Sequence, residues 1–277
     1  MNETAPITLE NRLRQSPLPK LEIRMLLQAA GGYSRTELIT RSGDMLPPEV
    51  LQRLHNFEQR RLAGEPMAYI LGEREFYGRI FQVNPSVLIP RSETEHLLEA
   101  AIERLPQGGT AWDLGTGSGA LAVSLALERP DAEVYASDIS PQALATAQAN
   151  ARRLGANIHF SCGSWFDTDR PSEKPFDILV SNPPYIEQHD PHLNQGDLRF
   201  EPQTALTDFS DGLSHIRTLA QGAPKYLKSQ GWLLLEHGYD QGSAVREILI
   251  QQGFTQTATL PDLAGCDRVT LGRWEGG

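Results

Sequence analysis

Cysteine is scarce in this sequence: Cys162 and Cys266 are the only two among 277 residues. Two cysteines are too few for a disulfide framework, and their separation does not match the spacing of a cysteine metal site. We therefore expect two reduced, partly buried thiols in a cytoplasmic protein. The sequence predicts no metal site.

Long apolar runs are also missing. No stretch approaches the ~20 apolar residues that a helix needs to cross a bilayer. The N-terminal segment "MNETAPITLENRLRQSP" has no basic region followed by an apolar core, so it does not resemble a secretory signal. These two observations predict a protein that neither enters nor binds a membrane.

Basic residues become scarce after the first 80 positions. Residues 1–80 carry eleven Lys and Arg against ten Asp and Glu, whereas the remainder carries fourteen against twenty-five. Affinity for nucleic acid depends largely on Lys and Arg that neutralise phosphates. The acidic remainder therefore disfavours a DNA or RNA substrate, although a local basic patch would be sufficient to bind one.

The first 71 residues are predicted to form a small helical domain. "PKLEIRMLLQAAGG" places Leu21, Met25 and Leu26 at helical spacing, and the two glycines end the pattern. Ser34 and Glu37 form the sequence pattern of a capping box. A further helix in "PPEVLQRLHNFEQRRLAGEP" has an apolar face. We expect a bundle with its own narrow core.

A connector is predicted at residues 72–91. Apolar and polar residues roughly alternate in "GEREFYGRIFQVNPSVLIP", with Gly78 between two short runs, which is typical of a β-hairpin. "SETEHLLEAAIERL" then predicts a helix that begins with a second capping box, formed by Ser92 and Glu95.

Residues 92–277 are predicted to form one α/β domain. From residue 110, candidate strands such as "TAWDLG", "AEVYASD", "NIHFSC" and "FDILVS" alternate with candidate helices. This alternation predicts a mostly parallel, Rossmann-like sheet covered by helices. Ligands of such sheets bind at the carboxyl ends of the strands, where the strand order reverses.

The first two strands of this region end in residues suited to a nucleoside ligand. "WDLGTGSGA" carries Gly115, Gly117 and Gly119, which allow the backbone to approach a ligand closely. Asp138 ends the next strand, where a carboxylate can accept the hydroxyls of a ribose. Ser140 is the better candidate for the cap of the following helix. NAD and S-adenosylmethionine both fit this pattern.

Asp113 favours the second of these ligands. It lies two residues before the first glycine, where its charge would repel a pyrophosphate and attract an ammonium group. The methionine end of S-adenosylmethionine carries an ammonium and a sulfonium. We therefore expect a methyl donor rather than a dinucleotide.

A third strand, "FDILVS", ends in Asn182-Pro183-Pro184-Tyr185. Both prolines fix φ and lack an N–H, so this turn is stiff and rich in acceptors. The Asn182 side-chain oxygen and the Pro183 carbonyl can accept the two N–H bonds of a planar NH2 group, and Tyr185 can pack on its plane. Such a site would promote methylation of the nitrogen through positioning and electrostatics. A proline-rich turn with a structural role is the alternative.

These motifs together resemble the class I S-adenosylmethionine-dependent methyltransferases that act on planar amino groups. The flanking segments "GEPMAYILGEREFYG", "VLIPRSETE", "SNPPYIEQHDPHLNQGDLRFEPQTAL", "LLLEHG" and "DRVTLGR" are similar to the release factor glutamine methyltransferase family. The resemblance implies transfer of a methyl group to the glutamine amide in the Gly-Gly-Gln motif of class 1 peptide chain release factors, leaving S-adenosylhomocysteine. It also implies that the N-terminal helical domain helps to hold the release factor.

The same resemblance assigns roles to individual residues. It implies substrate recognition by Asn182, Pro183, Pro184 and Tyr185, with Asn182, Pro183 and Tyr185 as the catalytic set. Trp165 could stack on the adenine or pack in the core with Phe166. The family often has an acid where this chain has Ser164, which can still accept a hydrogen bond. The implied donor-binding residues are Gly115, Thr116, Gly117, Ser118, Gly119, Asp138, Trp165 and Asn182.

Two other functions remain open. An adenine-amino methyltransferase acting on RNA or DNA would use the same chemistry at Asn182-Pro183-Pro184-Tyr185, and only the substrate would differ. A non-catalytic partner of the translation apparatus could bind the donor as a structural ligand, although an intact Asn182 argues against this.

The sequence also predicts the roles of polar residues outside these motifs. The group His189, Asp190 and His192 is expected to be a solvated loop rather than a metal site. Glu236 and His237 end a strand and are expected to face the crevice. An ion pair between Arg199 and Glu201 is expected to support the substrate loop.

Overall fold

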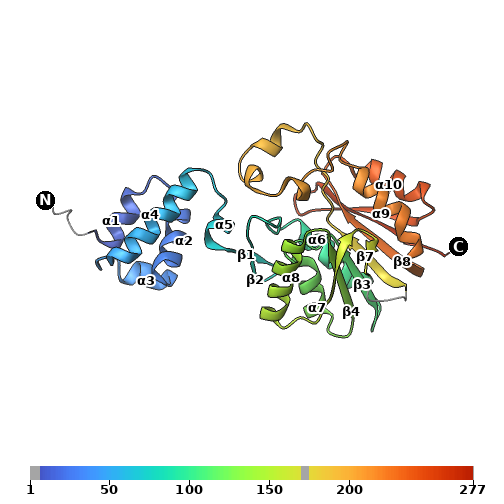
Figure 1. Cartoon of the computed structure of the whole chain (residues 1–277), viewed down its shortest axis with the longest axis horizontal. Helices are drawn as coiled ribbons and strands as arrows, with labels where there is room; N and C mark the ends of the chain where they lie inside the picture. The colour runs from blue at the N-terminus through green and yellow to red at the C-terminus, as the bar shows by residue number, and fades with distance from the viewer. Residues whose placement is uncertain (1–6, 170–174, 277) are drawn as a thin grey trace. The chain divides into compact units, whose positions relative to one another are not determined.

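The computed structural model describes residues 7–169 and 175–276, and the chain divides into two compact units, Met1–Gly72 and Glu73–Gly277. Each unit has a hydrophobic core of its own. The two units are described separately below (Figure 1).

The first unit is helical. Its core is formed mainly by apolar side chains of α2 and α4 together with Leu9 and Ile70. Ser34 and Glu37 form the predicted capping box at the start of α3. Leu21 was expected on the buried face but is 68% exposed, because the buried stripe of α2 is Ile23, Leu26, Leu27 and Ala30. The helices are α1 (Leu9–Gln15), α2 (Lys20–Gly31), α3 (Arg35–Thr40), α4 (Pro48–Leu62) and α5 (Met67–Leu71).

The second unit begins with the predicted β-hairpin, in which β1 (Glu73–Phe76) pairs with β2 (Arg79–Gln82). Tyr77 and Gly78 both have positive φ, as a tight hairpin turn of two residues requires. The capping box predicted at Ser92 does not form. Helix α6 (Thr94–Arg104) begins at Thr94, and the Glu95 carboxylate instead accepts a 3.0 Å hydrogen bond from the N–H of Tyr77.

A sheet of eight strands forms the centre of the second unit, in the order β6-β5-β4-β3-β7-β8-β10-β9. Strands β5, β4, β3, β7 and β8 run parallel, whereas β6, β10 and β9 pair antiparallel with their neighbours. Strand β6 was not predicted from the sequence. The bounds are β3 (Thr110–Leu114), β4 (Glu133–Asp138), β5 (His159–Ser164), β6 (Asp167–Thr168), β7 (Phe176–Ser181), β8 (Leu227–Glu236), β9 (Thr255–Pro261) and β10 (Asp267–Trp274).

Helices cover both faces of this sheet (Figure 1). Alternate side chains of the central strands point to opposite faces. One face packs with α6, α7 (Ala120–Glu128) and α8 (Pro141–Leu154). The other packs with α9 (Ser214–Gly222) and α10 (Gly242–Gln251). The mostly parallel, two-sided architecture expected from the sequence is confirmed.

The long connection from β7 to α9 contains only short 3-10 helices, at Pro191–Asn194, Leu198–Phe200 and Gln203–Ala205, and a fourth at Ala223–Lys225 follows α9. Cys162 and Cys266 are both exposed, so the expectation of partly buried thiols was wrong. Within residues 7–169 and 175–276, no helix combines the length and apolar character that crossing a membrane requires.

Candidate functional site

The order of the strands creates the crevice that holds the candidate site. Strand β3 lies between β4 and β7, so the chain leaves β3 toward one side of the sheet and later returns on the other. Gly115, Asp138 and Asn182 follow or end these three strands and line one crevice of about 480 Å³. Three motifs that are far apart in the sequence therefore meet where an open α/β sheet binds its ligands.

The glycine loop uses most of its backbone donors within the protein. The N–H groups of Gly115 and Thr116 both donate to the carbonyl of Ser137, at 2.9 Å each. The N–H of Gly117 donates to Asp138 Oδ2 at 2.8 Å. These donors are therefore already engaged, and the loop is not the open nest of N–H groups that would hold a pyrophosphate. This geometry argues against a dinucleotide.

Asp138 links the loop to the start of α8. Its second oxygen accepts a 2.9 Å hydrogen bond from the N–H of Ser140, and the Ser140 hydroxyl caps α8 by accepting from Ala143. Each carboxylate oxygen retains a further lone pair for a ligand hydroxyl. Burial raises the pKa of Asp138, although the hydrogen bonds from the loop oppose that rise.

Asp113 also lines the crevice and is 2% exposed. Burial raises its pKa to about 7, and the Asp138 carboxylate contributes to the rise, whereas a hydrogen bond from Thr116 opposes it. Two carboxyl groups thus share one wall of the crevice, and no cationic side chain among residues 7–169 and 175–276 is paired to either. A positively charged ligand group would relieve their repulsion.

Ser164 and Trp165 bring the end of β5 to the same crevice. Trp165 has a φ of 50° and its ring lies 5.1 Å from the ring of His215, between centroids. Phe166 turns away and packs between Trp112 and Tyr226. Of these two neighbouring aromatic rings, Trp165 therefore lines the crevice, whereas Phe166 belongs to the hydrophobic core.

Asn182 and Pro184 lie on the crevice, whereas Pro183 is buried and Tyr185 does not line it. Asn182 Nδ2 donates to Thr94 Oγ1 at 3.1 Å, and the Tyr185 hydroxyl lies 3.4 Å from Glu236 Oε1. Burial raises the pKa of Tyr185, so the hydroxyl stays protonated and can donate this bond. The turn is therefore held in place by contacts behind it. Of the other predicted positions, Thr116, Gly117 and Ser118 line the crevice, whereas Gly119 does not and packs against Ala147.

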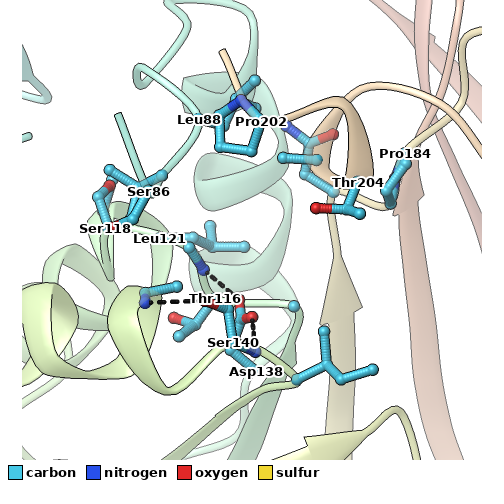
Figure 2. Close-up of a pocket in the computed structure, with 18 of the residues that line it drawn as sticks. Ser86, Leu88, Thr116, Ser118, Leu121, Asp138, Ser140, Pro184, Pro202 and Thr204 are labelled. Atoms are coloured by element: carbon cyan, nitrogen blue, oxygen red, sulfur yellow. Dashed lines mark hydrogen bonds between the residues drawn. The ribbon is translucent and has the colours of Figure 1, made fainter. Parts of the chain in front are cut away.

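Two segments that the sequence analysis did not assign complete the crevice, one within residues 85–91 and the other within residues 202–205. Figure 2 shows Pro184, Pro202 and Thr204 on the side opposite Asp138 and Ser140. Glu201 connects the two segments, because its buried carboxylate accepts a 2.9 Å hydrogen bond from the N–H of Ile89 and pairs with Arg91. The expected partner, Arg199, instead lies over the ring of Phe200.

Single crevice residues outside these segments were also missed, among them Thr94, Ile139, Phe209 and His215. Ile139 is 67% exposed directly after Asp138, and an apolar residue that follows a strand-ending acid was the available signal. Burial lowers the pKa of His215, so its ring favours the neutral form beside Trp165. No local pattern marked Phe209 or His215.

Glu236 and His237 do not line the crevice, contrary to expectation. His237 is buried, with Nδ1 2.8 Å from the carbonyl oxygen of Gly238 and Nε2 2.8 Å from Thr270 Oγ1. Both ring nitrogens are engaged, so the ring is not available as a base. In the loop, Asp190 pairs with His192 at 2.6 Å. The described part of the chain contains no group of three or more potential ligands arranged for a metal ion.

Comparison with known proteins agrees with this geometry. Residues 92–198 match the family model described as "Methyltransferase small domain", and residues 7–72 match the "PrmC N-terminal domain". A methyltransferase from Pyrococcus furiosus superposes with a TM-score of 0.56 at 18% identity, covering 80% of this chain and 99% of that one. The fold and the site define a class I S-adenosylmethionine-dependent methyltransferase.

Relatives of known sequence narrow the family. The release factor glutamine methyltransferase of Neisseria gonorrhoeae is 65% identical over 97% of this chain and 98% of its own length. The protein of the same name from Burkholderia pseudomallei is 47% identical over the full length of both chains. The chain belongs to the release factor glutamine methyltransferase family.

Proposed function

We propose that this protein transfers a methyl group from S-adenosylmethionine to the side-chain amide nitrogen of the glutamine in the Gly-Gly-Gln motif of peptide chain release factors. The observation that carries the proposal is the position of Asn182, whose side chain lies on a crevice that also contains Asp113 and Asp138. An amide acceptor and an anionic nucleoside site then share one cavity.

The residues present fit the methyl donor. Asp138 would accept the ribose hydroxyls, and Trp165 would contact the adenine. Asp113 and the loop Gly115–Gly119 would surround the charged methionine end, since no cationic side chain of the described residues is paired to the carboxyl of Asp113. When bound, the donor supplies an electrophilic methyl group on a sulfonium.

At the substrate side, Asn182 would accept one N–H of the glutamine amide through Oδ1, and the Pro183 carbonyl would accept the other. The amide lone pair is delocalised and therefore weakly nucleophilic. Two fixed acceptors stabilise the positive charge that develops on the nitrogen during transfer, and they hold it on the line of attack. Pro184, which lines the crevice, would limit the motion of the side chain, whereas Tyr185 would act only by holding the turn from behind. The N-methylated amide is cationic and strongly acidic after transfer, so it would lose its proton to water without a protein base.

The helical unit Met1–Gly72 is proposed to dock the release factor. Its charge is nearly balanced, in contrast to the acidic remainder of the chain. A factor that acts in translation would also place this enzyme in the cytoplasm.

The test uses methyl-labelled S-adenosylmethionine, a class 1 release factor, and the same factor with its Gly-Gly-Gln glutamine replaced by glutamate. We expect intact mass spectrometry to show one added methyl group on the first protein only, and peptide mapping to place it on the glutamine. Nucleic acid is included as a third substrate. Label in nucleic acid alone would overturn the proposal in favour of adenine methylation.

The Asn182→Ala variant tests the role of the turn. Transfer should fall by at least a hundredfold because the amide loses a fixed acceptor, while binding of the donor remains measurable by calorimetry. Wild-type turnover in this variant would contradict the proposed chemistry while leaving the identity of the substrate open.

A further inference from the structure

The side chain of Asn182 has a defined orientation. Its Nδ2 donates to Thr94 Oγ1 at 3.1 Å, so the nitrogen faces α6 and the oxygen is the atom left for the crevice. The two ends of an amide have nearly the same shape, and a half-turn about the last torsion exchanges them. In the exchanged orientation an NH2 group would face the NH2 of the substrate, and the acceptor would be lost.

The hydroxyl of Thr94 does not cap α6, although Thr94 lies at the start of that helix. It is the first residue of α6, and the capping position is occupied by Glu93, whose side chain makes no capping bond. Thr94 is 7% exposed and lies at the crevice. Its hydroxyl accepts from Asn182, and its interaction with the buried carboxyl of Glu236 favours the ionised form of that carboxyl. A single hydroxyl can serve both, because it has one proton to donate and two lone pairs.

Glu236 lies behind both residues of the turn. It ends β8 with an exposure of 0%, and its Oε1 is 3.4 Å from the hydroxyl of Tyr185. Its other oxygen, Oε2, has no partner in the described part of the chain. Burying a carboxyl with one unpaired oxygen is costly. A leucine or methionine could fill the same space without this cost, so a polar role is the better explanation.

The surroundings of Glu236 determine the pH range in which its carboxyl acts only as an acceptor. Burial raises its pKa to about 7 and Glu93 adds to the rise, whereas Thr94, Arg268 and Tyr185 oppose it. Above that pH the carboxylate is mostly ionised and only accepts hydrogen bonds. The Thr94 hydroxyl then donates to Glu236, which leaves its lone pair for the N–H of Asn182.

We propose that Thr94 and Glu236 are positioning residues for methyl transfer: the chain Asn182 Nδ2–Thr94 Oγ1–Glu236 holds the Asn182 oxygen toward the substrate, and Glu236 also fixes Tyr185. This inference rests on the proposed function, because it gives Asn182 Oδ1 the role of substrate acceptor. Neither residue reacts with the substrate.

Thr94→Val removes the hydroxyl but keeps the branched shape, and Thr94→Ser keeps the hydroxyl but removes a methyl group. The assay measures kcat and KM for a Gly-Gly-Gln peptide, the donor Kd by calorimetry, and the Tm. We expect Thr94→Val to lower kcat by about a hundredfold, as misplacing a reacting group does. Its donor Kd should stay within about twofold, because the donor contacts proposed above at Asp113, Asp138 and Trp165 do not involve the Thr94 hydroxyl. Thr94→Ser should keep most of the wild-type kcat.

Glu236→Gln provides the second variant and is needed if Thr94→Val does not fold. It preserves shape but offers Thr94 an NH2 group, which competes for the lone pair that Asn182 uses. We expect a lower kcat with an unchanged donor Kd, since Glu236 does not line the crevice.

Four outcomes decide the matter. A fall in kcat for Thr94→Val and Glu236→Gln, with Thr94→Ser active, supports the proposal. Equal losses in Thr94→Val and Thr94→Ser would overturn it in favour of simple packing. Wild-type kcat in both Thr94→Val and Glu236→Gln would overturn the positioning role alone. A wild-type chain that methylates no peptide or release factor would overturn the proposed function, and this inference with it.

Discussion

The hydroxyl of Thr116 donates a 2.7 Å hydrogen bond to Asp113 Oδ2, and this is the single side-chain hydrogen bond that Asp113 receives within the described residues. The carboxyl group is otherwise enclosed, and burial raises its pKa to about 7. A group with this pKa changes charge in the range where the enzyme would work, which makes Asp113 a sensitive reporter of what the crevice binds.

The affinity for S-adenosylmethionine should rise with pH. A cationic ligand group favours the ionised form of Asp113, and the carboxyl group becomes mostly ionised as the pH rises from about 6 to about 7.5. We expect the donor Kd to fall several-fold across this interval. Calorimetric titrations at fixed ionic strength measure it.

Asp113→Asn is the matched control, because it keeps the shape and can still accept from Thr116. Its donor Kd should be weaker and should lack this pH dependence. The ligand-free wild type should also lose stability relative to Asp113→Asn between about pH 4 and pH 7, since the folded state retains a proton that the unfolded chain has released. Identical pH dependence of the two proteins would contradict the role of Asp113.

Glu201 is expected to hold two walls of the crevice together. Its carboxylate is buried and accepts from the N–H of Ile89 while it pairs with Arg91. Glu201→Gln should therefore lower the free energy of unfolding by about 2 kcal/mol, because a buried partner of a charged group is lost. The donor should bind more weakly, since residues 85–91 and 202–205 both line its site. Denaturant unfolding and donor titration measure the two effects.

Glu187→Gln is the control for this change, because Glu187 is an exposed acid on the same connection between β7 and α9. It should alter stability by less than about 0.5 kcal/mol. A loss of donor affinity as large as that of Glu201→Gln would mean that net charge, and not the connection between the two walls, is responsible.

The sequence was sufficient to predict the features that depend on local pattern. Alternating strands and helices predicted the parallel sheet, and this placed the residues after three strands, Gly115, Asp138 and Asn182, at one edge. The structure brings all three to a single crevice. The alternation and the strand-end rule needed no knowledge of distant contacts.

Features that depend on distant contacts were not predictable in this way. The Ser92 capping box failed because Glu95 instead accepts from Tyr77 of the hairpin, a tertiary contact that outweighs the local pattern. Glu201 was assigned to Arg199, two residues away, but its partner is Arg91, 110 positions earlier. The residues near His237 in the sequence do not indicate that its Nε2 forms a hydrogen bond with the distant Thr270.

Two glycines of the donor loop should respond differently to alanine. Gly119 has a φ of 81°, and an added Cβ would lie 3.0 Å from Ala147 Cβ and 3.1 Å from its Cα. Gly117 has a φ of 55°, and an added Cβ would meet nothing within 4 Å on the crevice side of the loop. Both changes strain a left-handed backbone, but only the first also displaces α8.

Gly119→Ala should therefore lower the free energy of unfolding by about 3 kcal/mol, whereas Gly117→Ala should lower it by about 1 kcal/mol. The effect on donor binding should be the reverse: Gly117→Ala should weaken it more than Gly119→Ala does. The methyl group added at Gly117 would occupy space that the ligand needs. Thermal unfolding and donor titration on both variants test the pair. Equal donor affinity for Gly117→Ala and wild type would place the donor away from the loop.

Removal of the helical unit should separate substrate docking from donor binding. Residues 73–277 contain the whole crevice and two hydrophobic core clusters of their own, so a chain that begins at Glu73 should fold and bind S-adenosylmethionine with an unchanged Kd. If the helices hold the release factor, KM for the intact factor should rise by at least tenfold, whereas KM for a short Gly-Gly-Gln peptide should change little. The peptide is the internal control, because it is too small to need a second contact surface. An equal rise for both substrates would indicate a damaged catalytic unit, and no rise for either would remove the helical unit from substrate recognition.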